Sequence, residues 1–158
     1  MTALNDDPTL DESGERELAK RLFNAVWDLL ESGDRSLDDN ELMLNAAHAS
    51  LYHWLQVGDS VNEVRGEWQL ARVYSVLGRG EPALHHAQRS LDICLQHDIG
   101  DFDLAFAYEA LSRAHVVAGD RDLALDYAEQ ARAAGAGIAD EEDRDVFMGD
   151  VADLPTRF

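Results

Sequence analysis

The sequence is poor in residues that cross-link, kink or anchor a chain. Cys94 is the only cysteine, so an internal disulfide and a thiolate metal cluster are both excluded. Proline occurs three times in 158 residues, each time near an expected helix boundary. No stretch approaches the roughly 18 apolar residues of a membrane-spanning helix. We therefore expect one globular domain, with Cys94 packed as a core thiol because its neighbours follow apolar helical spacing.

Basic residues are also scarce. The chain has 13 Lys and Arg against 32 Asp and Glu, for a net charge of −19. Such a surface repels nucleic acid and anionic membranes, so neither is expected as a main partner. Lys20 is the only lysine, and abundant Asp with scarce Lys resembles the composition of proteins from salt-loving organisms. A GC-rich genome also favours Arg over Lys, although it does not by itself explain so large an excess of acid.

Motifs for catalysis and metal binding are missing as well. The sequence has no G-x-S-x-G, no glycine-rich phosphate loop and no H-E-x-x-H. His48 and His53 are five residues apart and so lie on different faces of a helix. We expect no enzyme, no metal and no cofactor. The acidic, polar start of the chain is unlike a signal peptide, and a cytoplasmic location is the expectation.

The sequence contains segments with apolar residues at three- and four-residue spacing. Gly and Asp residues, which are typical of helix ends and helix starts, separate these segments. The segments predict an all-α domain over 14–154, after a flexible acidic segment, 1–13. Short connections predict antiparallel neighbours. Ser60 and Glu63 fit a capping box for the third helix. The expected elements are hairpins at about 14–57, 60–97 and 101–135 and a capping helix at about 140–153, which makes about seven helices.

An internal repeat gives these helices an architecture. Seven residues recur after 41 positions, through a helix, a turn and a second helix. A register held over that length is typical of stacked helical hairpins in a right-handed α-solenoid. The recurring residues are Leu70, Arg72, Val76, Gly78, Ala83, Leu84 and Ala87, followed by Leu111, Arg113, Val117, Gly119, Ala124, Leu125 and Ala128.

The repeated hairpins resemble tetratricopeptide repeats over about residues 64–138, and the N-terminal part does so by analogy. The second hairpin departs from the family pattern where His115 replaces a tyrosine, and the 41-residue period exceeds the family's length of about 34. The matching positions are Leu70, Ala71, Tyr74, Gly78, Ala83, Ala87 and Ser90 in the first hairpin, and Tyr108, Leu111, Ser112, Gly119, Ala124, Ala128 and Ala131 in the second.

The resemblance implies a protein- or peptide-binding scaffold that uses the first helix of each hairpin as the wall of a concave groove. Arginine beside tryptophan suits an acidic peptide or a free C-terminal carboxylate. The alternative is that Arg72 and Arg113 only neutralise nearby carboxylates. The groove residues carried over from the family are Lys20, Phe23 and Trp27, then Arg65, Trp68 and Arg72, then Phe106, Glu109 and Arg113.

Two further hypotheses remain open. His48 and Tyr52 share a helix face, and if that face turns toward Arg72 and Arg113 it forms a polar pocket for a small anionic ligand between the second, third and fifth helices. The first helix, with Phe23, Trp27 and Leu30, also offers an apolar face for a homodimer.

Overall fold

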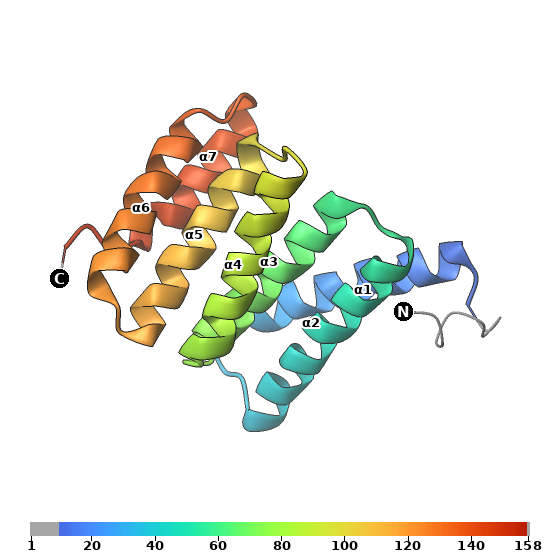
Figure 1. The fold of residues 1–158 in the computed structure, drawn as a ribbon. Helices are drawn as coiled ribbons and strands as arrows, with labels where there is room; N and C mark the ends of the chain where they lie inside the picture. The colour runs from blue at the N-terminus through green and yellow to red at the C-terminus, as the bar shows by residue number, and fades with distance from the viewer. Residues whose placement is uncertain (1–9, 158) are drawn as a thin grey trace.

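The computed structural model describes residues 10–157, and that part of the chain is all-α (Figure 1). It contains seven α-helices, one short 3₁₀ helix and no strand, as the apolar spacing predicts. The predicted flexible segment lies largely outside the described residues. The helices are α1 (Glu12–Glu31), α2 (Leu37–Val57), α3 (Ser60–Val76), α4 (Gly80–Gln96), α5 (Asp101–Ala118), α6 (Arg121–Ala136) and α7 (Glu141–Asp150), followed by the 3₁₀ helix η1 (Val151–Asp153).

Short polar side chains set the helix starts. Asp11 accepts a hydrogen bond from the backbone N–H of Gly14 at 2.7 Å, so α1 begins at residue 12 and not at 14. The capping box of α3 lies one residue before the predicted Ser60 and Glu63. Its members are Asp59 and Asn62, because residue 59 has the extended backbone of a cap and 60 is already helical.

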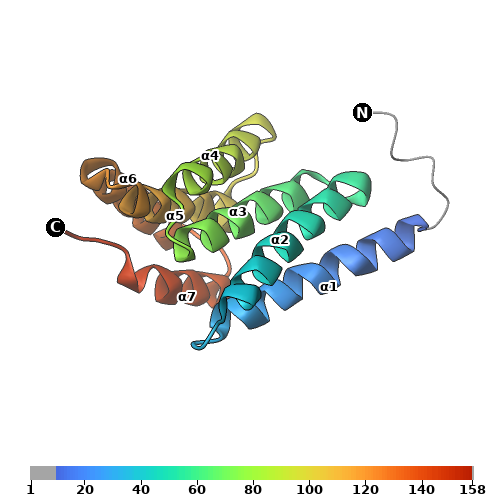
Figure 2. The ribbon, with the colours of Figure 1, turned by 90° about the horizontal axis from the view of Figure 1, so that it is seen from below.

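The helices pack as neighbouring pairs. The most extensive contacts join α1 to α2, α3 to α4 and α5 to α6, and each pair also packs on the next. Seen from below, α4 and α6 lie along one face, α3 and α5 form a middle layer, and α1 and α7 lie on the opposite side (Figure 2). This arrangement is compatible with a helical repeat. None of the helices in residues 10–157 has the length and apolar content needed to cross a bilayer.

One contact occurs twice, 41 residues apart. Tyr74 of α3 stacks on His86 of α4 with ring centroids 5.6 Å apart and an interplanar angle of 3°. In the next pair, His115 of α5 stacks on Tyr127 of α6 at 5.5 Å and 7°. The residue types are exchanged between the helices while the stack is kept. The same ring stack therefore occurs at matching positions of the two helix pairs, and His115 is a compensated exchange rather than a loss.

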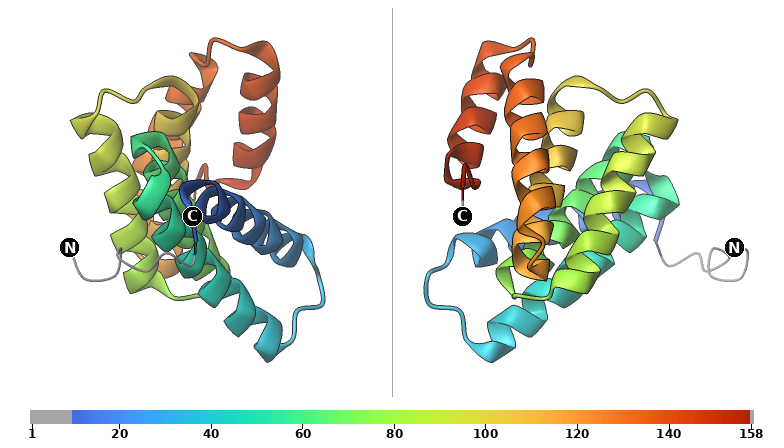
Figure 3. Two further views of the ribbon diagram at one scale, coloured as in Figure 1. Left: turned by 90° about the vertical axis from the view of Figure 1, so that its right-hand side faces the viewer. Right: turned by 60° about the vertical axis from the view of Figure 1, so that its left-hand side comes forward.

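The apolar interior has two parts. The larger joins the first five helices and includes the buried Cys94, whose thiol pKa is raised to about 11 by burial and the nearby charge of Asp103. The smaller attaches α7 and η1 to α5 and α6 through Phe147, Val151 and Leu154. Figure 3 shows the resulting position of α7, which stands beside α5 and on the same side of the molecule as α1.

Close approach at Gly135 is what lets α7 dock. A Cβ at this position of α6 would meet ring atoms of Phe147 at 2.2 and 2.3 Å, which is far inside van der Waals contact. Phe147 is fully buried and has no free space to yield. A residue larger than glycine at 135 must therefore push α7 outward.

We expect Gly135→Ala to lower the free energy of unfolding by roughly 1 to 3 kcal/mol through overpacking, measured by urea denaturation. The matched control is Gly149→Ala in α7, where an added Cβ meets nothing within 4 Å. That control should gain stability by up to about 1 kcal/mol from helix propensity. Equal effects from both substitutions would contradict the docking contact.

Candidate functional site

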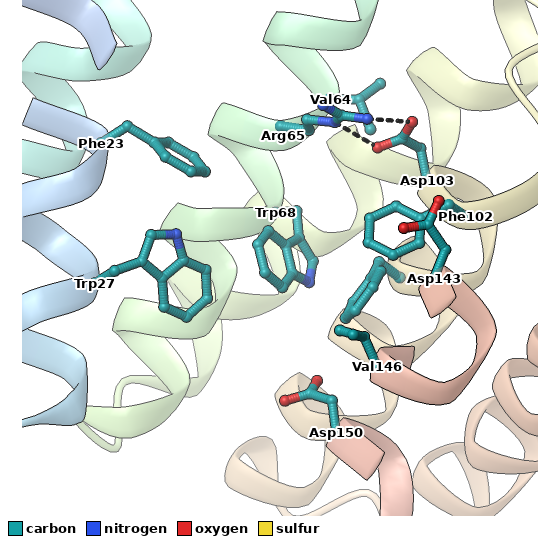
Figure 4. Close-up of a pocket in the computed structure, with 11 residues that line it drawn as sticks. Phe23, Trp27, Val64, Arg65, Trp68, Phe102, Asp103, Asp143, Val146 and Asp150 are labelled. Atoms are coloured by element: carbon teal, nitrogen blue, oxygen red, sulfur yellow. Dashed lines mark hydrogen bonds and ion pairs between the residues drawn. The ribbon is translucent and has the colours of Figure 1, made fainter. Parts of the chain in front are cut away.

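A groove of about 570 Å³ lies on the side of the molecule that carries α1 and α7. Helix α1 forms one wall, α7 the other, and α3 and α5 the base between them (Figure 4). Its lining residues are Phe23, Trp27, Val64, Arg65, Trp68, Phe102, Asp103, Phe106, Asp143, Val146 and Asp150.

A continuous row of aromatic rings crosses this groove. Phe23 and Trp27 are one helical turn apart on α1, with ring centroids separated by 6.3 Å. Trp27 lies 5.3 Å from Trp68, which lies 5.0 Å from Phe106, and Phe106 lies 4.7 Å from Phe102. Both tryptophans are only half-buried. The row thus offers large apolar rings to a molecule in the groove.

Helix α7 supplies the opposite wall through one stripe of its surface. Asp143, Val146 and Asp150 are spaced at three and four residues, so all three face the groove. Phe147 lies on the adjoining stripe of the helix and is buried in the core. Helix α7 therefore anchors itself with one stripe and presents carboxylates to the groove with the next.

Arg65 stands at the rim of the groove with a fixed partner. Its guanidinium donates to both carboxylate oxygens of Asp103, at 2.8 and 3.2 Å. The hydrogen bonds that Arg65 donates to Asp103 raise the pKa of Arg65, although partial burial opposes the shift. The arginine is therefore held in place on α3 by a residue of α5, and its charge is already balanced.

A buried carboxylate lies below the aromatic row. Glu109 is fully buried, and its Oε2 accepts a hydrogen bond from Nε1 of Trp68 at 2.8 Å. Its Oε1 lies 3.2 Å from Arg72 and also accepts from Nε of Arg113. A buried charge of this kind is tolerated only with such partners. Glu109 consequently fixes both the indole of Trp68 and the two repeat-related arginines.

The same arginines bind the C-terminal part of the chain. Arg72 donates to both carboxylate oxygens of Asp150, at 2.9 and 2.7 Å. Arg113 donates to Asp153 and to the backbone carbonyl of Asp150 at 2.8 Å. The hydrogen bond from Arg113 lowers the pKa of Asp153. Burial opposes the charge of Arg113, but the hydrogen bonds and charges of Asp153 and Glu109 raise its pKa overall.

The sequence-predicted groove residues divide into two groups. Arg65 and Trp68 line the aromatic groove, together with Phe23, Trp27 and Phe106. Arg72 and Arg113 instead line a neighbouring hollow of about 350 Å³, and each is already ion-paired. Glu109 lies buried between the groups and reaches no surface. Neutralisation of carboxylates, the alternative interpretation of the repeated arginine, therefore describes the contacts that the structure contains.

The predicted polar pocket between α2, α3 and α5 does not form. The His48 side chain turns to α3 and α4, where its Nε2 lies 2.8 Å from the hydroxyl of Tyr74 and its ring packs against His86. Tyr52 is exposed and contacts His53. Tyr74 and Arg72 are two residues apart, about 200° around α3, so they point to opposite sides of that helix. The histidine and the arginine consequently never meet.

The structure also shows what the side chains singled out on the first helix contact. Phe23 and Trp27 face the groove rather than an end of the domain, and Leu30 packs partly against the larger core. Lys20 lines a smaller hollow beside Arg65. Homodimerisation through this helix stays a prediction, but the apolar face proposed for it is the wall of the groove.

Sequence reasoning missed the residues that close the groove. Phe102 and Asp103 precede the matched repeat positions, and nothing in the acidic sequence of the capping helix singled out Asp143, Val146 and Asp150 as a set. One signal was available. The spacing of Asp143, Val146 and Asp150 puts them on a stripe distinct from Phe147 and Val151, but only the direction in which α7 docks says what the stripe faces.

Comparison with protein-family models, with curated proteins and with solved structures gave no match for this chain.

The buried network around Glu109 predicts that removing its charge lowers the free energy of unfolding. Glu109→Gln leaves Arg72 and Arg113 without their shared buried carboxylate, and breaking a buried pair in this way costs about 3 to 5 kcal/mol. Glu63→Gln is the matched control, because Glu63 pairs with Arg89 at 3.0 Å in a more exposed setting worth less than about 1 kcal/mol. Urea denaturation measures both. Similar losses in the two variants would show that breaking the buried Glu109 network costs no more than breaking an exposed ion pair.

The His48 contact predicts a pH effect. Burial and the neighbouring His86 lower the pKa of His48 from 6.5, while Glu67 partly opposes them. The unfolded chain then binds the proton more readily, so this contribution to stability is present above pH 6.5 and is lost as the pH falls below it. Relative to wild type, His48→Gln should lose less stability between pH 7.5 and 5.5, whereas exposed His85→Gln should follow wild type. A parallel course for H48Q would refute the effect.

Proposed function

We propose that this chain is a non-catalytic, tetratricopeptide-like α-solenoid whose groove binds a segment of a partner protein. Two features support the solenoid. The α3–α4 and α5–α6 hairpins repeat the same His–Tyr stack, and each pair packs on the next. Small residues lie buried at the matching positions of both hairpins, including Ala83 and Ala124, where the helices approach closely.

The observation that carries the binding role is the row of half-buried rings in the groove. Trp27 and Trp68 keep part of their apolar surface in water although a deeper core lies beside them. Aromatic residues in such positions are the usual anchors of protein interfaces, since they bury a large area with little loss of conformational freedom. A partner side chain placed against them would complete that burial.

The dimensions of the groove fit a peptide segment. A hollow of about 570 Å³ holds several side chains, and it lies between helices that are far apart in sequence. The Trp68 indole is pre-positioned by Glu109, so little order has to be gained on binding. A second copy of this chain is a poorer occupant, because a net charge of −19 opposes self-association.

A groove-filling variant tests the proposal. Val146 is exposed and points into the groove, so Val146→Trp should occupy the space without disturbing the core. Leu55→Trp on α2 is the matched control, because Leu55 is similarly exposed outside the groove. Twelve-residue peptides displayed from a random library are selected on the wild-type protein, and the dissociation constants of synthetic copies are measured with all three proteins.

We expect the selected peptides to bind wild type and L55W alike and to bind V146W at least about tenfold more weakly, a loss of about 1.4 kcal/mol. Circular dichroism establishes that the variants are equally folded. Peptides that bind V146W as tightly as wild type, or a selection that yields no binder, would refute the groove as a peptide-binding site.

A further inference from the structure

The charges around the groove are unequal once the internal pairs are counted. One arginine and three aspartates line it, namely Arg65, Asp103, Asp143 and Asp150. Arg65 and Asp103 neutralise each other through two hydrogen bonds. The lining that remains consists of aromatic rings, two valines and the two carboxylates of α7.

The arginines behind the groove do not reverse this balance. Arg72 and Arg113 carry two positive charges, and they share the three negative charges of Glu109, Asp150 and Asp153. That cluster is negative as a whole. An acidic ligand would have to displace Asp150 and Asp153 from these arginines, and the resulting competition works against it.

We propose that the segment bound in the groove carries a lysine or arginine next to apolar residues, which is the opposite charge to the one suggested by the arginines of the sequence. This inference rests on the proposed function. The apolar neighbours would lie on Trp27 and Trp68, while the cation would lie beside Asp143. Asp150, about 10 Å further along α7, adds negative charge to the same wall.

The geometry of the two walls suits such a side chain. Asp143 and Asp150 lie on either side of Val146 along α7, and all three face the groove that Trp68 lines (Figure 4). A long basic side chain can pack its methylene stem on an aromatic face and place its charge at the carboxylates. A cation over a tryptophan ring is itself attracted by the ring electrons. Both attractions point to the same kind of residue.

The carboxylates also retain capacity to accept. The carboxylate of Asp143 forms no ion pair with another side chain in the described residues, although its charge helps to raise the pKa of Arg65. That of Asp150 accepts two hydrogen bonds from one guanidinium nitrogen of Arg72 and lies 3.8 Å from Arg113. An ionised carboxylate has about four acceptor positions. A bound cation therefore adds to the existing network without breaking the contact between Arg72 and Asp150.

Charge-matched peptides separate this inference from the proposed function. The tightest peptide selected on wild type is resynthesised with each Lys or Arg changed to Gln and, separately, to Glu. Binding is followed by the fluorescence of Trp27 and Trp68 in a Trp54→Phe background, which removes the third tryptophan of the chain. The protein variants are Asp143→Asn in the groove and Asp145→Asn, an exposed control in the same helix that does not line the groove.

We expect enrichment of basic residues beside apolar ones and a loss of about five- to tenfold when the critical basic residue becomes Gln. The same loss should appear for D143N with the original peptide, and the two changes together should cost less than their sum. D145N should bind like wild type. Affinity should fall as salt is raised from 50 to 500 mM, because exposed charges are screened.

Two results would overturn the inference while leaving the proposed function intact. One is enrichment of neutral or acidic peptides that V146W still fails to bind. The other is a basic peptide whose affinity is the same for wild type and D143N. If no peptide distinguishes wild type from V146W, the groove itself is refuted and the charge preference with it.

Discussion

The structure depends on one buried carboxylate. Glu109 has no contact with water, and it is held by Trp68 of α3, Arg72 of α3 and Arg113 of its own helix. The same arginines extend to Asp150 and Asp153, so α7 is attached to the middle layer through this group. Buried ion pairs add little net stability but are costly to break. Here the network defines one position for α7, and thereby the second wall of the groove.

This network explains why the two arginines recur. Their 41-residue spacing places both on the inner side of successive first helices, and a binding role was the natural hypothesis for a charge that packing does not require. The structure shows two equivalent arginines converging on a single acid, Glu109, which occupies the repeat position of Trp68. Trp68 and Glu109 thus occupy equivalent positions 41 residues apart and form a hydrogen bond with each other. The aromatic row beside this network stays partly exposed, and it is the surface at which we propose that a partner binds.

The exchange of tyrosine and histidine shows what a repeat conserves within one chain. Tyr74 and His86 in one hairpin become His115 and Tyr127 in the next, and the rings stack at nearly the same distance and angle. Taken alone, His115 looks like a departure from the pattern. Considered with its partner, it preserves the contact, because either ring can occupy either side of a planar stack. Only the pairing across helices makes that visible.

Local sequence determined the helices and most of their boundaries, since apolar spacing, Asp caps and glycines act within a few residues. The positive φ angles of Gly78 and Gly119, at 72° and 85°, lie where the Gly and Asp pattern predicted helix ends. The 41-residue register also indicated which helices form hairpins. Tertiary structure alone decided the partners of Arg72 and Arg113, the separation of His48 from them and the direction of Asp143 and Asp150. Each of these depends on where α7 docks and how far each helix is rotated about its axis, which contacts between distant residues control and local spacing does not.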